Sequence, residues 1–154
     1  MKKILVFATV LMIGLGGTQL QAATGGNVGI GARLGAPTGL SVKIWKQPSR
    51  SMNFAAAWDL GQNGSMILQA DYVFYDYDLL GISFDGGSVP LYYGVGLQAR
   101  IADQGGLGIR IPVGLDFNFN DKPLDFFFEL APTLNLIPAT DFELSGGIGA
   151  HYYF

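Results

Sequence analysis

The sequence predicts an all-β protein, a closed eight-stranded antiparallel up-and-down transmembrane β-barrel. Hydrophobic residues make up 49% of the 154 residues, whereas charged residues make up only 14%. The 23 glycines and seven prolines argue against long helices, and the high apolar content argues against intrinsic disorder. Beyond the N-terminal segment, apolar residues recur at every second position, which is the period of a β-strand.

Residues 1–22 have the pattern of a secretory signal peptide. Lys2 and Lys3 form a basic head, residues 4–15 are apolar, and a short tail of small and polar residues follows. The apolar stretch is shorter than the ~20 residues that a membrane-spanning helix needs. We therefore expect this segment to be removed, leaving residues 23–154 as one outer-membrane barrel domain.

The charge and cysteine content exclude several classes of function. The mature chain would hold seven basic and twelve acidic residues, a net charge of −5. An acidic chain without a basic cluster is not expected to bind nucleic acid. Cysteine is absent, which excludes disulfide scaffolds, thiolate zinc sites and cysteine nucleophiles.

Eight segments show the strand alternation. In the segment 89–101, Leu91, Tyr93 and Val95 share one face, while Tyr92 and Gly94 lie on the other. The last four segments follow this pattern closely and the first four more loosely. The predicted strands are 27–36, 40–46, 52–60, 65–75, 89–101, 107–119, 124–136 and 142–154.

Clusters of proline, glycine, asparagine and aspartate separate the predicted strands, as turns require. The connection at 76–88 is irregular, because Leu80, Ile82 and Phe84 keep the strand phase. We expect the fourth strand to run on to a turn at 85–87, forming a long hairpin that protrudes from the barrel. If both termini face the periplasm, this hairpin faces the periplasm as well.

The orientation of the two faces decides between a membrane barrel and a soluble one. One face is uniformly bulky and apolar, whereas the other is rich in glycine and carries isolated charges. This distribution favours an apolar face toward lipid and a small lumen filled by side chains. The aromatic residues expected to form an interfacial girdle are Trp45, Trp58, Tyr92, Tyr93, Phe117, Phe119, Tyr152 and Phe154.

The predicted lumen holds positive and negative side chains in near balance. Such charges are costly in a membrane protein unless they are paired, so we expect an interior ion-pair network. Its predicted members are Arg33, Lys43, Asp59, Asp71, Arg100, Arg110, Asp116, Glu129, Glu143 and His151.

The end of the chain, residues 149–154, resembles the terminal strand of small outer-membrane β-barrels of Gram-negative envelopes. This resemblance implies that Ala150, Tyr152 and Phe154 form the signal read by the barrel-assembly machinery. More narrowly, segments 31–45, 92–96 and 108–115 resemble a family of eight-stranded outer-membrane proteins with no assigned activity. The resemblance implies a fold, an outer-membrane location and lipid as a partner, but no catalytic residue or cofactor.

Four other functions are alternatives to a structural role. A secreted or periplasmic soluble β-barrel that binds a small apolar ligand is the main alternative, and a narrow pore is another. A lipid-modifying enzyme would need His151 beside a serine, either Ser145 or Ser41, and the sequence does not bring them together. Adhesion would need long external loops, and the loops predicted there are short. We therefore expect a monomer without catalytic activity, metal or cofactor, whose role is structural or interactive.

Overall fold

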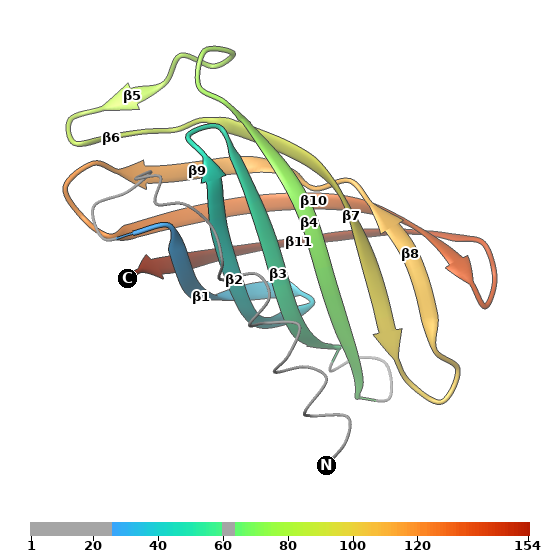
Figure 1. Ribbon diagram of the computed structural model, residues 1–154. Helices are drawn as coiled ribbons and strands as arrows, with labels where there is room; N and C mark the ends of the chain where they lie inside the picture. The colour runs from blue at the N-terminus through green and yellow to red at the C-terminus, as the bar shows by residue number, and fades with distance from the viewer. Residues whose placement is uncertain (1–25, 60–63) are drawn as a thin grey trace.

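The chain forms one sheet that closes on itself. The structure is a computed structural model that describes residues 26–59 and 64–154. The strands of the barrel wall are β1 (Val28–Ala36), β2 (Thr38–Gln47), β3 (Arg50–Asp59), β4 (Ser65–Asp76), β7 (Leu91–Ile101), β8 (Gly106–Arg110), β9 (Val113–Phe119), β10 (Leu124–Ile137) and β11 (Asp141–Tyr153). A small hairpin of β5 (Ser83–Phe84) and β6 (Gly87–Ser88) is added to this wall. Figure 1 shows the wall and the hairpin.

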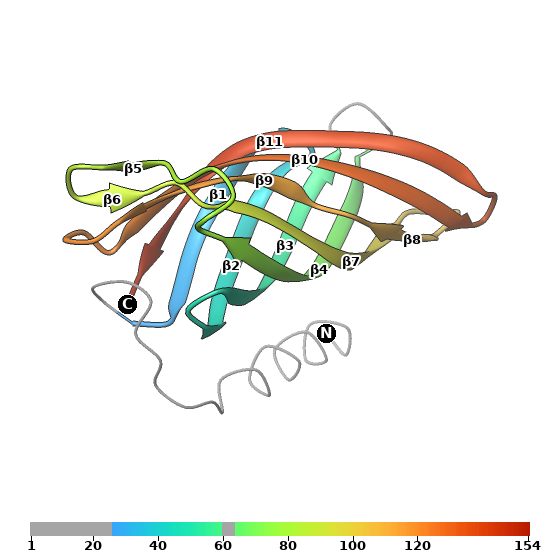
Figure 2. The ribbon, with the colours of Figure 1, turned by 90° about the horizontal axis from the view of Figure 1, so that it is seen from above.

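Closure comes from the last strand. β11 pairs antiparallel with β10 on one side and with β1 on the other, from Gly29 opposite Tyr153 to Ala36 opposite Gly146. β8 and β9 both pair with β7 and with β10, so they occupy one position in the ring. Figure 2 shows the curvature of the closed sheet. The predicted closed eight-stranded antiparallel barrel is confirmed.

The strand predicted over 107–119 is interrupted. It divides into β8 and β9 at Ile111 and Pro112, because proline has no N–H to donate to the neighbouring strand. The backbone remains attached on both sides of the break. Ile111 N donates to Pro132 O at 2.9 Å, and Pro112 O accepts from Gly94 N at 2.9 Å.

Glycine on the inward face allows close approach at the closing seam. A Cβ on Gly31 would collide with the carbonyl oxygen of Ala150 on β11. A Cβ on Gly149 would collide with the ring of Phe127. Glycine at these positions therefore leaves room for the backbone of the next strand and for large side chains in the lumen.

The two faces of the wall differ in burial, as the alternation of the sequence predicts. The apolar face is exposed, with Leu97 at 63% and Phe142 at 66% of their full accessible surface. The buried polar side chains of the inward face include Arg33, Ser41, Lys43, Gln69, Asp71, Gln98, Arg110, Asp116, Asp125, Glu129, Thr133, Ser145 and His151. The molecule is therefore apolar outside and polar inside, the reverse of a soluble domain.

Two residues of the predicted girdle lie inside the barrel. Trp45 and Tyr92 are each 2% exposed, because both share the inward phase of their strands with charged or polar residues. The other members lie on the outer face, where Trp58 and Tyr93 are 43% and 46% exposed. The prediction was wrong for the two buried rings because it used closeness to a strand end and ignored the phase.

The protruding segment differs from the predicted long hairpin. β4 ends at Asp76, whose Oδ1 accepts from the backbone N–H of Asp78 at 3.0 Å and of Leu79 at 2.9 Å. This local turn stops the strand. The segment then forms β5 and β6, each two residues long, and β6 pairs with the end of β9. Residues 77–88 are called the extension below, and Figure 1 shows β5 and β6 projecting beyond the ends of β4 and β7.

We expect deletion of residues 80–84 to leave the barrel able to fold. The deletion removes a backbone hydrogen bond from Val89 N to Ile82 O and a ring contact between Phe84 and Phe119. The loss of these two contacts together should lower the free energy of unfolding by about 1–3 kcal/mol. The check is gel mobility with and without boiling in detergent. If no compact unboiled band formed, the extension would be part of the barrel core.

Candidate functional site in the barrel lumen

Lys43 is the centre of a buried ion cluster near the end of the barrel at which β1 begins and β11 ends, called the terminal end. Its Nζ lies 2.5 Å from Asp116 Oδ2 and 2.7 Å from Asp125 Oδ2. The three residues are at most 1% exposed. Because they come from β2, β9 and β10, the cluster ties strands across the lumen.

Asp125 also begins a hydrogen-bonded chain that ends at a serine. Its Oδ1 lies 2.8 Å from Nδ1 of His151, and His151 Nε2 lies 2.8 Å from Ser41 Oγ. An ionised carboxylate only accepts, so Nδ1 donates to it and Nε2 is left to accept from the serine hydroxyl. Tyr153 OH also donates to Asp125 Oδ2. The imidazole is thereby fixed at both nitrogens.

A second ion cluster fills the middle of the lumen. Arg110 Nη2 lies 2.6 Å from Glu129 Oε1, and Arg110 Nη1 lies 3.3 Å from Asp71 Oδ2. Arg33 Nη1 lies 3.3 Å from the same Glu129 oxygen, and Tyr92 OH donates to the other at 3.0 Å. Each acidic side chain therefore has at least one basic partner, as buried charges require.

Neutral amides extend the middle cluster. Arg33 Nη1 donates to Gln69 Oε1 at 3.0 Å, and Gln69 Nε2 donates to Gln98 Oε1 at 2.8 Å. Farther from the terminal end, Arg100 Nη2 lies 3.1 Å from Glu143 Oε2. These two side chains are 25% and 32% exposed, so their attraction is weaker than that of the buried pairs.

Aromatic side chains fill the lumen at the terminal end. The ring centroids of Trp45 and Tyr75 are 4.5 Å apart, and those of Tyr75 and Tyr92 are 5.6 Å apart. Trp45 Nε1 donates to Tyr153 OH at 3.1 Å. Lys43 Nζ lies 5.4 Å from the Trp45 ring and 5.5 Å from the Tyr75 ring, within the range of cation–π attraction.

The predicted network residues fall into three groups. The structure brings Lys43, Asp116 and His151 into the cluster at the terminal end, and it brings Arg33, Asp71, Arg110 and Glu129 into the middle cluster. Arg100 and Glu143 form a separate pair. Asp59 ends β3, and its side chain lies outside the described part of the structure.

The sequence reasoning missed Asp125, which contacts Lys43, His151 and Tyr153. Its inward phase was readable from the alternation of 124–136, but its partners were not. The sequence left either Ser145 or Ser41 as the serine beside His151. Ser145 Oγ instead donates to Ala131 O at 3.1 Å, and Ser41 is the serine beside the imidazole.

A small cavity lies between the two clusters. Its volume is about 30 Å³, and its lining includes Arg33, Ser41, Asp71 and His151. A cavity of this size with polar walls can hold water. Ser41, His151 and Asp125 have the order of a nucleophile, a base and an orienting acid, and Ser41 is buried beside this small cavity. In residues 26–59 and 64–154, no group of three or more His, Asp or Glu side chains is placed to hold a metal ion.

One solved structure has a similar fold. The N-terminal β-barrel domain of Pseudomonas aeruginosa OprF superposes with a TM-score of 0.62, over 85% of this chain and 100% of that chain. This chain has the fold of the OprF barrel. The two sequences are 16% identical, so the likeness to OprF concerns the fold and assigns no activity. No protein-family model and no curated protein matches the sequence.

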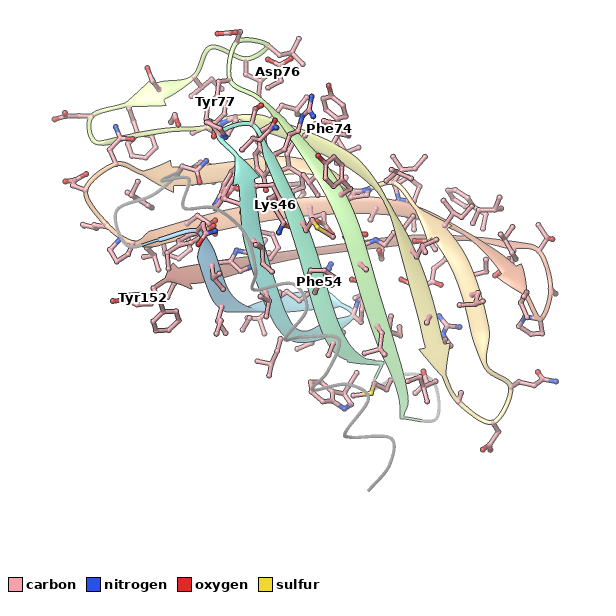
Figure 3. All side chains as sticks on the ribbon, viewed as in Figure 1. Lys46, Phe54, Phe74, Asp76, Tyr77 and Tyr152 are labelled. Carbon is pink, nitrogen blue, oxygen red and sulfur yellow. The ribbon has the colours of Figure 1, made fainter. Side chains whose placement is uncertain are left out.

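The OprF likeness bears out the barrel fold, and the narrower resemblance to a family of eight-stranded outer-membrane proteins stays a prediction. The predicted signal peptide 1–22 lies outside the described residues. At the other end of the chain, Tyr152 and Phe154 are exposed on the outer face, and Figure 3 shows Tyr152 pointing away from β11. Within the described ranges, no helix is long and apolar enough to cross a membrane.

Proposed function

We propose that the protein is an integral outer-membrane β-barrel with a structural or interaction role, acting as a monomer with its lumen filled by its own side chains. The observation that carries the proposal is the inverted polarity of the wall. Large apolar side chains cover the outside, while paired charges occupy the inside. An exposed apolar surface of this extent needs a lipid environment, and closure satisfies every strand edge of the wall within it.

The main alternative, a soluble barrel with an apolar ligand, requires an apolar cavity inside. The described lumen instead contains ion clusters, packed aromatic rings and a cavity of about 30 Å³ lined partly by charged groups. Exposed residues such as Leu97 would also remain unexplained in water. Burial thus contradicts the arrangement on which this alternative depends.

The filled lumen supports a barrel that does not conduct ions. Packed rings of Trp45, Tyr75 and Tyr92 occupy the terminal end, and the cross-lumen ion pairs lie next to them. The test is conductance of the purified protein in a planar bilayer. We expect no channel steps, and regular steps would establish the pore function instead.

We also propose that Ser41, His151 and Asp125 hold the lumen together and do not catalyse a reaction. The burial of Ser41 and the small size of the cavity beside it support this proposal. A fluorophosphonate probe should therefore fail to label the folded protein. Labelling that disappeared in Ser41→Ala would show a reactive nucleophile and support the enzyme alternative. A reactive serine hydrolase labelled in the same mixture is the positive control.

Arginine substitutions on the outer wall test the membrane environment. Leu97 lies in the middle of β7, whereas Leu115 pairs with Leu91 at the beginning of that strand. We expect Leu97→Arg to lower the unfolding free energy in lipid by about 2–4 kcal/mol and Leu115→Arg by less, since the cost falls toward the interface. Gln104→Arg, in an exposed turn, is the control.

The measurement is denaturant titration in vesicles, read by the shift in gel mobility between unboiled and boiled samples. Parent protein recovered in the soluble fraction without a mobility shift would contradict the membrane proposal. An equal effect of the two wall substitutions and the turn control would contradict it as well.

A further inference from the structure

The extension exposes a concentration of apolar side chains that the barrel wall does not explain. Five of its twelve residues are large and exposed, namely Tyr77 (39%), Leu79 (63%), Leu80 (42%), Ile82 (50%) and Phe84 (38%). Connections between strands at the surface are ordinarily polar, with small or turn-forming residues. A cluster of this kind marks a surface that contacts something other than water.

The extension is held in a defined position against the barrel. Besides the pairing of β6 with β9, Asn120 N donates to Gly86 O at 2.8 Å, and Tyr77 OH donates to Pro48 O at 3.2 Å. Figure 3 shows Tyr77 beside Asp76 at the end of β4. The apolar side chains of the extension are therefore held at a fixed height relative to the barrel wall.

Aromatic contacts with the outer face of the wall fix the height of the extension. The ring of Phe84 lies 5.5 Å from that of Phe119, which lies 6.0 Å from that of Phe126. Lys122 Nζ lies 5.9 Å from the Phe119 ring. The extension thus continues the aromatic surface of the wall without a break.

Other wall rings make contacts at the same terminal end. Phe74 and Tyr93 are stacked at 5.9 Å, with the guanidinium of Arg50 5.5 Å from the Phe74 ring. Rings accompanied by basic side chains are typical of the level at which lipid headgroups begin. Through its ring contact with Phe119, Phe84 is placed beside these wall aromatics, at the height expected for the lipid headgroups.

We propose that the extension is an interfacial anchor, which inserts Ile82, Phe84 and the neighbouring leucines into the headgroup boundary of the leaflet at the terminal end. The proposal rests on the membrane location proposed above. The extension contains Asp78 and Asp85 and no basic residue. It therefore suits a zwitterionic phospholipid surface, and it binds by apolar insertion with little dependence on salt.

The absence of cysteine from the sequence allows single-label tests. Ile82→Cys and Ser83→Cys place a fluorescent label on opposite sides of the hairpin, because successive strand residues point to opposite faces. Leu97→Cys marks the middle of the wall, and Gln104→Cys marks the opposite end. Each labelled full chain, once it shows the compact unboiled band, is reconstituted into phosphatidylcholine vesicles. Quenching is measured with lipid nitroxides at two depths and with aqueous iodide.

We expect the label at 82 to lose fluorescence with the shallow lipid nitroxide and to be protected from iodide, in low and in high salt. The label at 83 should be quenched more by iodide, the label at 97 by the deep nitroxide, and the label at 104 by iodide alone. Iodide quenching at 82 with lipid quenching at 97 would overturn the anchor alone and point to a protein partner. Iodide quenching at both 82 and 97 would overturn the membrane location itself.

Discussion

We expect Lys43→Met to lower the free energy of unfolding by about 3–5 kcal/mol, because it leaves two buried carboxylates without their shared cation. The side chains of Asp116 and Asp125 are at most 1% exposed, so water cannot replace the ammonium group. Methionine retains most of the length of lysine, which keeps the packing against Trp45 and Tyr75 nearly unchanged. The measurement is denaturant titration of the refolded protein in vesicles.

Two further variants separate the lost charge from a general effect of the substitution. Lys46→Met, on the same strand with its side chain in the outward phase, should have little effect. Adding Asp116→Asn to Lys43→Met should recover part of the loss, because Asp125 retains His151 and Tyr153 as donors. A double variant as unstable as the sum of the two single variants would contradict the coupling of these groups.

Replacement of Arg110 should lower the free energy of unfolding as much as replacement of Lys43. Lysine at position 110 should restore only part of this stability. Arg110 contacts Glu129 through Nη2 and Asp71 through Nη1, so one planar group serves two acidic side chains. We expect Arg110→Met to cost about 3–5 kcal/mol, since Asp71 loses the cation it contacts and Glu129 is left with Arg33 at 3.3 Å. Arg110→Lys keeps the charge but loses one charge-assisted contact, at about 1.5–3 kcal/mol.

Arg100 provides the matched control for Arg110. It also pairs with a glutamate, but both side chains are partly exposed. Arg100→Met should therefore cost at most about 1 kcal/mol. If the two methionine variants were equally stable, burial would not determine the strength of these ion pairs, and the account of the lumen given above would be wrong.

The alternation of the sequence was sufficient to predict the barrel and the side of the wall on which each charge lies. Period-two patterning fixes the phase of a strand, so Lys43 and Glu129 were placed inward from sequence alone. The break at Pro112 was also readable in principle, because proline cannot donate to the ladder. The end of β4 at Asp76 depends on a local side-chain turn, which the continuing apolar alternation of 80–84 concealed.

The partners of each charge could not be predicted in this way. Lys43 and Asp125 are 82 residues apart in the chain, and they meet because the stagger between strands brings them to the same height. The phase of each strand determines which residues face the lumen. The stagger between strands determines which of those residues are in contact. Ser41 and His151, 110 residues apart, became neighbours for the same reason.

The register between β1 and β11 determines whether the hydrogen bonds of the interior form when the barrel closes. Gly31 lies opposite His151, so the imidazole reaches past a residue without a side chain to Ser41 on β2. A slip of β11 by one residue would reverse its two faces, turning His151 toward lipid and an outward residue such as Tyr152 inward. Asp125 would then be buried without its imidazole donor. In the observed register, β11 thus completes both the ring and the hydrogen bonding of its interior.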